Sequence, residues 1–183
     1  MTTASITSGS VNATAINPSE ASSVVDNGDS TCTVFMKHRA AFRSDMTAAA
    51  VLTALGWSAI AVTRSGNSRA NSFNPTAIVY VDPWINPNTQ GAGCQLKIEG
   101  DAAVFRSDTA LATVQALLDP TKTASVTRSG STTPSSVTRD QVVTADVWTN
   151  PATGALGCQL RMKDGSIINT DSTVATVTTA LNA

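Results

Sequence analysis

Two of the three cysteines stand in nearly identical surroundings, and a recurring cysteine is a residue type open to chemistry. The sequence GCQL occurs at 93–96 and again at 157–160, so Cys94 and Cys158 share their neighbours, whereas Cys32 lies in the less similar TCTVFMK. Such a cysteine is typical of a metal ligand, a catalytic nucleophile or a disulfide partner. Each of these roles requires a second group in a suitable place.

The sequence contains little that would complete a metal site or a catalytic site. Structural zinc sites use close ligand pairs such as Cys-x₂-Cys, and none is present. His38, the only histidine, would lie about 20 Å from Cys32 in an extended strand, since each residue advances about 3.3 Å. Phosphate-binding loops and nucleophile elbows are absent from the sequence as well. We therefore predict that the protein is not an enzyme and has no catalytic residue, bound metal or cofactor.

The cysteines are better explained as reduced thiols. The N-terminal sequence has no basic stretch followed by an apolar one, so we expect no secretory signal. Oxidised frameworks usually have an even number of cysteines in a secreted chain, and this chain has three. An intermolecular disulfide through one of them stays open.

Charge and hydropathy limit the kinds of partner. Charged residues make up 14% of the chain and the formal net charge is −1, so the chain has neither a basic arm nor an acidic tail. Apolar runs stay shorter than the roughly 18 residues of a membrane-spanning helix, and we expect no membrane partner. With no catalytic constellation, we also expect no small-molecule substrate.

Several short sequences occur twice at one spacing. VTRSG lies at 62–66 and again at 126–130, an offset of 64 residues (126 − 62), and DPWINP at 82–87 returns as DVWTNP at 146–151 with the same offset. FRSD at 42–45 and at 105–108 indicates a third, more diverged copy. We predict a single domain over 1–183 made of internal repeats of about 60 residues, at 3–56, 59–119 and 123–183.

Each repeat is expected to have the order β-β-β-α. In the strand that carries the cysteine, Cys94 and Leu96 alternate with Gln95 and Lys97, which predicts one apolar and one polar face. The longer strand before it predicts a second apolar row, formed by Val79, Val81, Val143, Ala145 and Val147. A helix should follow each cysteine strand, capped by Ser44 or Asp45, Ser107 or Asp108, and Asp171. Gly56 should end the first helix, and Asp119-Pro120 the second.

These elements predict an α+β fold: an antiparallel β-sheet with helices packed on one face and the other face open. Two kinds of charged residue recur on its strands, Arg64 with Arg128 and Asp82 with Asp146. Duplication preserves residues for structural reasons as well as functional ones, so a structural or interface role and a direct functional role both stay open.

The order of elements and the pattern of polar and apolar residues in one repeat resemble the C-terminal part of the coat proteins of single-stranded RNA bacteriophages. The resemblance lies in a strand with VTRS, a polar loop, a long strand, an Asn-Pro turn, and a strand leading through FRSD into the helix TALATVQALL. It covers about one repeat at a time. In that family the sheet of a dimer faces the capsid interior and touches genomic RNA, while helices cover the outer face and hold subunits together.

The resemblance implies a self-assembling coat protein that forms dimers and a large icosahedral-type shell around single-stranded genomic RNA. Such a protein would be made in the cytoplasm of the bacterial host and reside in the virion. By position on the polar sheet face, it implies an RNA-contacting set. This set is Lys97, Arg161, Lys163, Gln95, Gln159, Tyr80 and Thr144.

The same repeats also fit a second class of protein. A non-viral or phage-tail binding module could use the polar sheet face, or the loops NSRANSFNP at 67–75 and STTPSSVTR at 131–139, for recognition. A small hydrolase, the third class, has no supporting constellation of residues.

Overall fold

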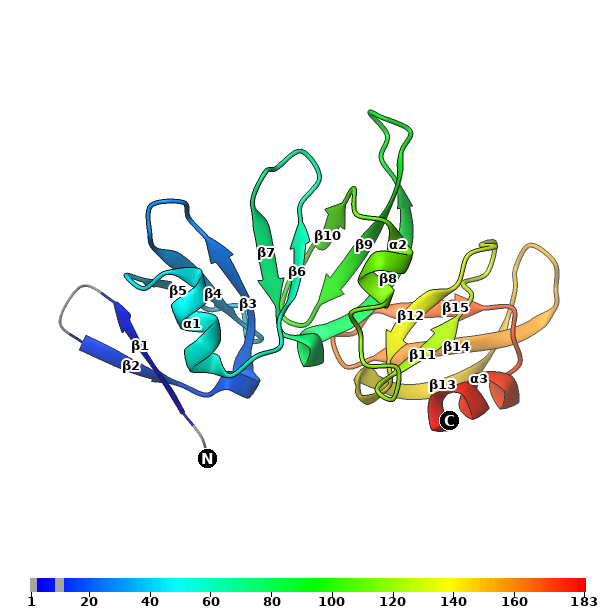
Figure 1. Cartoon of the computed structure of the whole chain (residues 1–183). Helices are drawn as coiled ribbons and strands as arrows, with labels where there is room; N and C mark the ends of the chain where they lie inside the picture. The colour runs from blue at the N-terminus through cyan, green and yellow to red at the C-terminus, as the bar shows by residue number, and fades with distance from the viewer. Residues whose placement is uncertain (1–2, 9–11) are drawn as a thin grey trace.

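The computed structural model describes residues 3–8 and 12–183 of the chain, which are drawn as a ribbon in Figure 1. In these residues, strands in antiparallel sheets predominate and three α-helices pack against them, so the predicted α+β class is confirmed. The same order of elements occurs three times along the chain: a two-stranded hairpin, a short 3-10 helix, three strands and an α-helix. We call these stretches segments 1, 2 and 3.

The bounds of the elements follow this order in each segment. Segment 1 consists of β1 (Ala4–Ser8), β2 (Asn12–Ile16), η1 (Pro18–Glu20), β3 (Ala21–Asp26), β4 (Cys32–Met36), β5 (Ala41–Ser44) and α1 (Ala48–Leu55). Segment 2 consists of β6 (Ile60–Thr63), β7 (Ala70–Phe73), η2 (Pro75–Ala77), β8 (Ile78–Ile85), β9 (Ala92–Ile98), β10 (Val104–Ser107) and α2 (Leu111–Gln115). Segment 3 consists of β11 (Thr123–Val126), β12 (Ser135–Thr138), η3 (Arg139–Gln141), β13 (Val142–Thr149), β14 (Leu156–Met162), β15 (Ile167–Thr170) and α3 (Val174–Asn182).

Each segment therefore has two strands more than the predicted β-β-β-α order. β7 and β12 lie within the stretches that were expected to be polar recognition loops, and β10 lies within the approach to the second helix. These strands have four residues each and contain Ser, Asn or Arg, so they show little alternation of polar and apolar residues. Pairing with neighbouring strands, which the local sequence does not show, makes them extended.

The sheets cross the boundaries between segments. Strand order is β5-β4-β3-β7-β6 in one five-stranded sheet and β10-β9-β8-β12-β11 in the other, so each of these sheets takes its last two strands from the following segment. The remaining described strands form the three-stranded sheet β13-β14-β15 and the isolated hairpin β1-β2. Figure 1 shows this hairpin at one end of the molecule and segment 3 at the other.

The apolar side chains form three cores, and each core belongs mainly to one segment. In segment 2, Ile60, Val62 and Phe73 of the hairpin pack with sheet residues such as Leu96 and with Val114 of α2. The core of segment 1 is likewise built from its own hairpin, sheet and helix, and the core of segment 3 also includes Val79 and Tyr80 of β8. The hairpins β6-β7 and β11-β12 are thus hydrogen-bonded to the sheet of the preceding segment, while their apolar side chains pack on the sheet of their own segment. These two contacts together join the segments.

The predicted apolar row of the cysteine strands is confirmed. Cys94 and Leu96 have no exposed surface, and Cys158 and Leu160 are equally buried in segment 3. All three cysteines are free, and each lies in a different core. Burial in apolar surroundings raises the pKa of Cys94 to about 11, and it also raises the pKa of Cys32 and Cys158. At neutral pH these thiols are protonated packing residues.

The glycine of GCQL has a steric role. A Cβ atom added at Gly93 would lie 2.1 Å from the carbonyl oxygen of Ser107 on the paired strand β10, and one at Gly157 would lie 2.2 Å from that of Thr170 on β15. Both contacts are with backbone, which a rotamer change cannot relieve. Glycine is therefore required where the cysteine strand passes closest to its neighbour.

We expect Gly93→Ala to lower the free energy of unfolding by about 2–3 kcal/mol, because β9 and β10 must separate to admit the methyl group. Gly91→Ala is a matched control in the same stretch of chain, since its Cβ would meet only the Thr89 hydroxyl at 3.2 Å. Urea unfolding of both variants measures the difference. Equal midpoints for the two variants would contradict this account of the GCQL glycine.

The helices begin at other residues than predicted. Thr47 and Thr173 cap α1 and α3 by accepting from the backbone of Ala50 and Thr176, and Ala110 precedes α2 without a side-chain cap. The predicted capping residues are engaged elsewhere, as with Ser44, which donates to the carbonyl oxygen of Thr7. Gly56 ends α1 in the left-handed conformation, as predicted, whereas α2 ends at Gln115, before Asp119. Within the described ranges, none of the helices is long and apolar enough to cross a membrane.

Candidate functional site

Two of the seven residues assigned to RNA by the resemblance do not lie on an open sheet face. Tyr80 is 9% exposed and packs in the core of segment 3, with the Arg128 guanidinium 4.6 Å from its ring centre. The Lys97 side chain is 13% exposed, and its Nζ lies 3.7 Å from Asp164 Oδ2. The expectation of an open face is wrong for segment 2, because the hairpin β11-β12 and the rest of segment 3 cover it.

Gln95 and Gln159 are half-buried on interior strands of their sheets. Gln95 of β9 lies between Asp82 of β8 and Arg106 of β10 in the sheet register. Gln159 of β14 donates from its Nε2 to Asn169 Oδ1 on β15. The Gln159 amide is therefore held within its sheet.

The exposed members of the set all belong to segment 3: Thr144, Arg161 and Lys163. Thr144 donates to Asp146 Oδ2 at 2.7 Å, and Arg161 Nε lies 3.8 Å from the same oxygen, with both charged side chains more than half exposed. An ion pair this exposed is weak. Arg161 and Lys163 are thus available cations on the open surface of segment 3.

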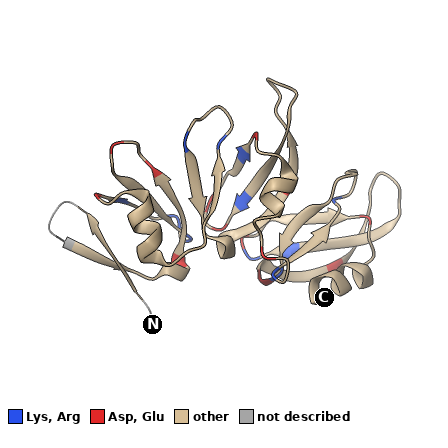
Figure 2. Cartoon of the chain, viewed as in Figure 1, with Lys and Arg blue, Asp and Glu red and all other residues tan. Residues whose placement is uncertain are grey.

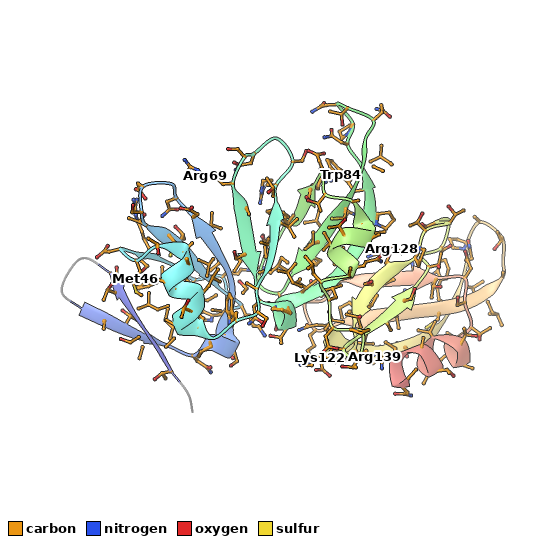
Figure 3. All side chains as sticks on the ribbon, in the orientation of Figure 1. Met46, Arg69, Trp84, Lys122, Arg128 and Arg139 are labelled. Atoms are coloured by element: carbon orange, nitrogen blue, oxygen red, sulfur yellow. The ribbon has the colours of Figure 1, made fainter. Side chains whose placement is uncertain are left out.

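A hollow at the base of segments 2 and 3 gathers further basic residues. Lys37, Lys122 and Lys163 line it together with Asp119 and Asp140. Figure 3 shows Lys122 beside Arg139, whose backbone N–H donates to the Lys122 carbonyl oxygen. Elsewhere the charged residues are scattered along the ribbon in Figure 2, and the two acids keep this hollow mixed in charge.

The recurring arginines and aspartates have different surroundings in different segments. Arg128 donates from Nε to Asp82 Oδ1 at 2.9 Å, and its Nη2 lies 2.7 Å from Asp82 Oδ2, which joins segment 3 to segment 2. Asp82 is 3% exposed, whereas its counterpart Asp146 is exposed. Arg64 lies over the Phe105 ring at 4.9 Å. Of the recurring residues, Arg128 and Asp82 thus form an ion pair that holds segment 3 to segment 2.

A second recurring cluster fastens the turn after the long strand. The Asn86 amide donates to Ser65 Oγ at 3.0 Å and to Asp108 Oδ1 at 2.7 Å. In segment 3, Asn150, Ser129 and Asp171 make the equivalent contacts. These hydrogen bonds hold the pKa of Asp108 and Asp171 below its ordinary value. Each cluster ties a turn, a hairpin end and the approach to a helix, which is a structural function.

Strand β13 exposes apolar side chains that the sequence assigned to the interior. Val143 is 61% exposed and Val147 is 70% exposed, whereas Val142 and Ala145 pack against the core of segment 3. The expected row of Val143, Ala145 and Val147 is wrong at Val143, because the pairing of β13 with β14 shifts register between Val142 and Thr144, and such a bulge turns the residues on either side to opposite faces. Val147 pairs with Cys158 and Ala145 with Leu160, so these two residues share a face as predicted, but Val147 is exposed on it.

These exposed residues form the candidate assembly surface, which we define as Val143, Val147 and Leu156 together with the unpaired edge of β13. Leu156 at the start of β14 is 67% exposed. Exposed apolar residues and a free strand edge are each typical of protein–protein contacts. The sequence alone does not reveal this surface, because its signal, an apolar row, is the same as that of a core strand.

The described part of the chain has no group of three or more His, Cys, Asp or Glu residues that could hold a metal ion. Comparison of the chain with protein-family models gave no match, and comparisons with curated proteins and with solved structures gave none either. Function must therefore be inferred from the surfaces described above.

Proposed function

We propose that this protein is a self-assembling coat protein of a small RNA bacteriophage, which forms a shell and contacts genomic RNA. In this proposal the three segments are copies of one unit, with approximate limits 3–56, 59–119 and 123–183. The protein would reside in the virion after synthesis in the host cytoplasm. The resemblance of one unit to single-stranded RNA phage coat proteins suggested this function, and the surface of segment 3 supports it.

The observation that carries the proposal is the exposed apolar surface of segment 3. Val143, Val147 and Leu156 are each more than 60% exposed, as given above, beside a strand edge that has no partner within the described residues. The helices add to this, because the sequences of α1, α2 and α3 contain no charged residue. Surfaces of this kind favour association with other copies over solvation as a monomer.

RNA contact is proposed for a smaller set than the resemblance implied. Arg161 and Lys163 are exposed and can reach phosphates, with Gln159 beside them. Tyr80 and Lys97 are excluded from this set because segment 3 covers them. A shell needs only weak binding per subunit, since many copies act together on one RNA.

The proposal predicts that the recombinant chain forms closed particles that contain RNA. Electron microscopy should show shells, and the ratio of absorbance at 260 nm to that at 280 nm should exceed that of free protein. Arg161→Gln combined with Lys163→Gln should retain the shells and lower their RNA content. Arg69→Gln is the control, because Arg69 donates to the Asn27 carbonyl oxygen in segment 1, away from this surface. A discrete monomer or trimer without RNA would overturn the proposal.

The alternative function, a recognition module that uses loops, has less support, because part of each expected loop is a strand. The stretches 67–75 and 131–139 contain β7 and β12, whose backbones pair with β3 and β8. They are therefore structural connections between segments rather than free recognition loops.

A further inference from the structure

Two strands, β13 and β2, lack a pairing partner that the equivalent strands of the other segments have. β3 and β8 each pair with a hairpin strand of the following segment, β7 or β12, whereas β13 pairs with β14 alone. At the other end of the molecule, β2 pairs with β1 alone, although its counterparts β7 and β12 are interior strands. Every other edge strand in the described ranges has counterparts that are edge strands too.

The two internal junctions use the same register. Ser72 lies opposite Val24 at the first junction, and Ser136 lies opposite Val81 at the second. Both serines stand two residues before the N-cap of the following 3-10 helix, Asn74 or Thr138. The junction is thus a repeated contact with fixed geometry. The same geometry can be applied to β2, which precedes η1 as β7 precedes η2 and β12 precedes η3.

A side-chain hydrogen bond marks the same place at both junctions. The N-cap side chain donates to the first carbonyl group of the neighbouring long strand: Asn74 Nδ2 to Ala21 O at 2.9 Å, and Thr138 Oγ1 to Ile78 O. Asn17 is the N-cap of η1, and its Oδ1 accepts from Ser19 N as Asn74 Oδ1 accepts from Thr76 N. Asn17 therefore presents the same donor at the equivalent position.

A hairpin that pairs with the long strand buries residues of that strand. Ser22, Ser23 and Val24 of β3 are buried, as are Val79, Tyr80 and Val81 of β8. The equivalent stretch of β13, 143–145, is exposed at Val143 and Thr144. On the hairpin side, Thr14 is exposed, whereas its counterpart Ser135 has no exposed surface. Both unpaired strands thus expose the positions that are covered at the internal junctions.

We propose that copies of this chain associate head to tail, with β2 of one copy adding as an antiparallel strand to β13 of another. Continuing the internal register places Ile16 opposite Thr144 and Ala15 opposite Ala145, with the Asn17 amide at the carbonyl oxygen of Val142. The occupant of the β13 edge is the hairpin β1-β2 of a second copy. The inference rests on the proposed function only in that the chain associates with itself.

One chain cannot make this contact with itself, because β2 and β13 lie at opposite ends of the molecule (Figure 1). The contact joins two different surfaces, so it propagates into a ring or an open filament rather than closing as a two-fold dimer. It also lacks the Arg128–Asp82 ion pair, since Ser8 stands two residues after buried Ile6 where Arg128 stands two residues after buried Val126. It should therefore be weaker than the junction between segments 2 and 3 and, as a contact between two chains, depend on protein concentration.

Two variants separate the two sides of the contact. Thr14→Arg combined with Ala15→Arg, the hairpin variant, adds bulk and charge to β2, while Val143→Arg, the edge variant, does the same to β13. All three positions are exposed in the single chain, so the variants should fold, which circular dichroism and urea midpoints check. Ser5→Arg is the matched control, because Ser5 and its counterparts Ala61 and Ser125 are all exposed.

Light scattering after size-exclusion chromatography should show concentration-dependent oligomers for the unmodified chain and for Ser5→Arg. The hairpin variant and the edge variant should each be monomeric, with association weakened more than tenfold. Mixed in equal amounts they should form a discrete heterodimer, because the hairpin variant retains an intact β13 and the edge variant an intact β2.

Several outcomes would overturn the proposal. They are a monomeric unmodified chain at all soluble concentrations, oligomers of the hairpin variant alone, which would indicate β13 pairing with β13, or no heterodimer in the mixture. The coat function fails separately. Oligomers that pass the mixing test but never form RNA-containing shells would remove the coat function and leave the head-to-tail contact. Shells formed equally well by the hairpin variant and the edge variant would instead remove the head-to-tail contact and leave the coat function.

Discussion

Phe105→Ala is expected to lower the free energy of unfolding by about 3–5 kcal/mol. Phe105 is 2% exposed, its ring meets that of Phe73 edge to face at a centroid distance of 4.8 Å, and Arg64 lies over its other side. Truncation leaves a cavity between the hairpin β6-β7 and the sheet of the same segment, and it removes the aromatic pair as well. Because that hairpin also pairs with β3, the loss reaches the junction with segment 1.

Phe42→Ala is the matched control for this variant, because Phe42 occupies the same place in the first FRSD sequence and is only half-buried. Its loss of stability should be less than half that of Phe105→Ala. Urea unfolding followed by tryptophan fluorescence compares the two. Equal losses would mean that burial in the hairpin–sheet interface does not set the cost.

Arg128→Met should lower the free energy of unfolding by about 3 kcal/mol, because it leaves the Asp82 carboxylate buried without its cation. The two side chains meet at two points, and the Asp82 side chain is 5% exposed. Since the pair joins β8 to segment 3, its loss should also speed amide hydrogen exchange at the junction of β8 with β12. The methionine keeps a long apolar side chain at this position, while the guanidinium that lies over the Tyr80 ring is lost together with the ion pair.

Two further variants test the cause. Arg64→Met, at the same place in segment 2, removes only the contact with the Phe105 ring and should cost less than about 1 kcal/mol. Asp82→Val added to Arg128→Met should restore most of the stability, because Val25 stands at the equivalent position of β3 at the first junction. If the double variant were as unstable as Arg128→Met, an uncompensated buried charge would not be the reason.

Local features with a clear period or a fixed conformation could be predicted from the amino-acid sequence. Alternation in the cysteine strands placed Cys94 and Leu96 in the core, because one side of a strand packed on a helix must be apolar. Gly56 ends α1 because glycine adopts the left-handed conformation without strain. The α+β class followed from the same patterns.

Tertiary structure alone decided which strands pair and which surfaces remain open. The short strands β7 and β12 have no distinctive pattern, and they are extended because their backbone groups pair with β3 and β8. Tyr80 and Thr144 occupy equivalent positions in sequence, yet Tyr80 is buried and Thr144 is exposed, because a hairpin covers β8 and none in the described chain covers β13. Alternation fixes only which face of its own strand a side chain takes. Whether that face meets solvent depends on contacts between residues far apart in sequence, such as Ser136 with Val81, which are 55 positions apart (136 − 81), and these form only when the segments join.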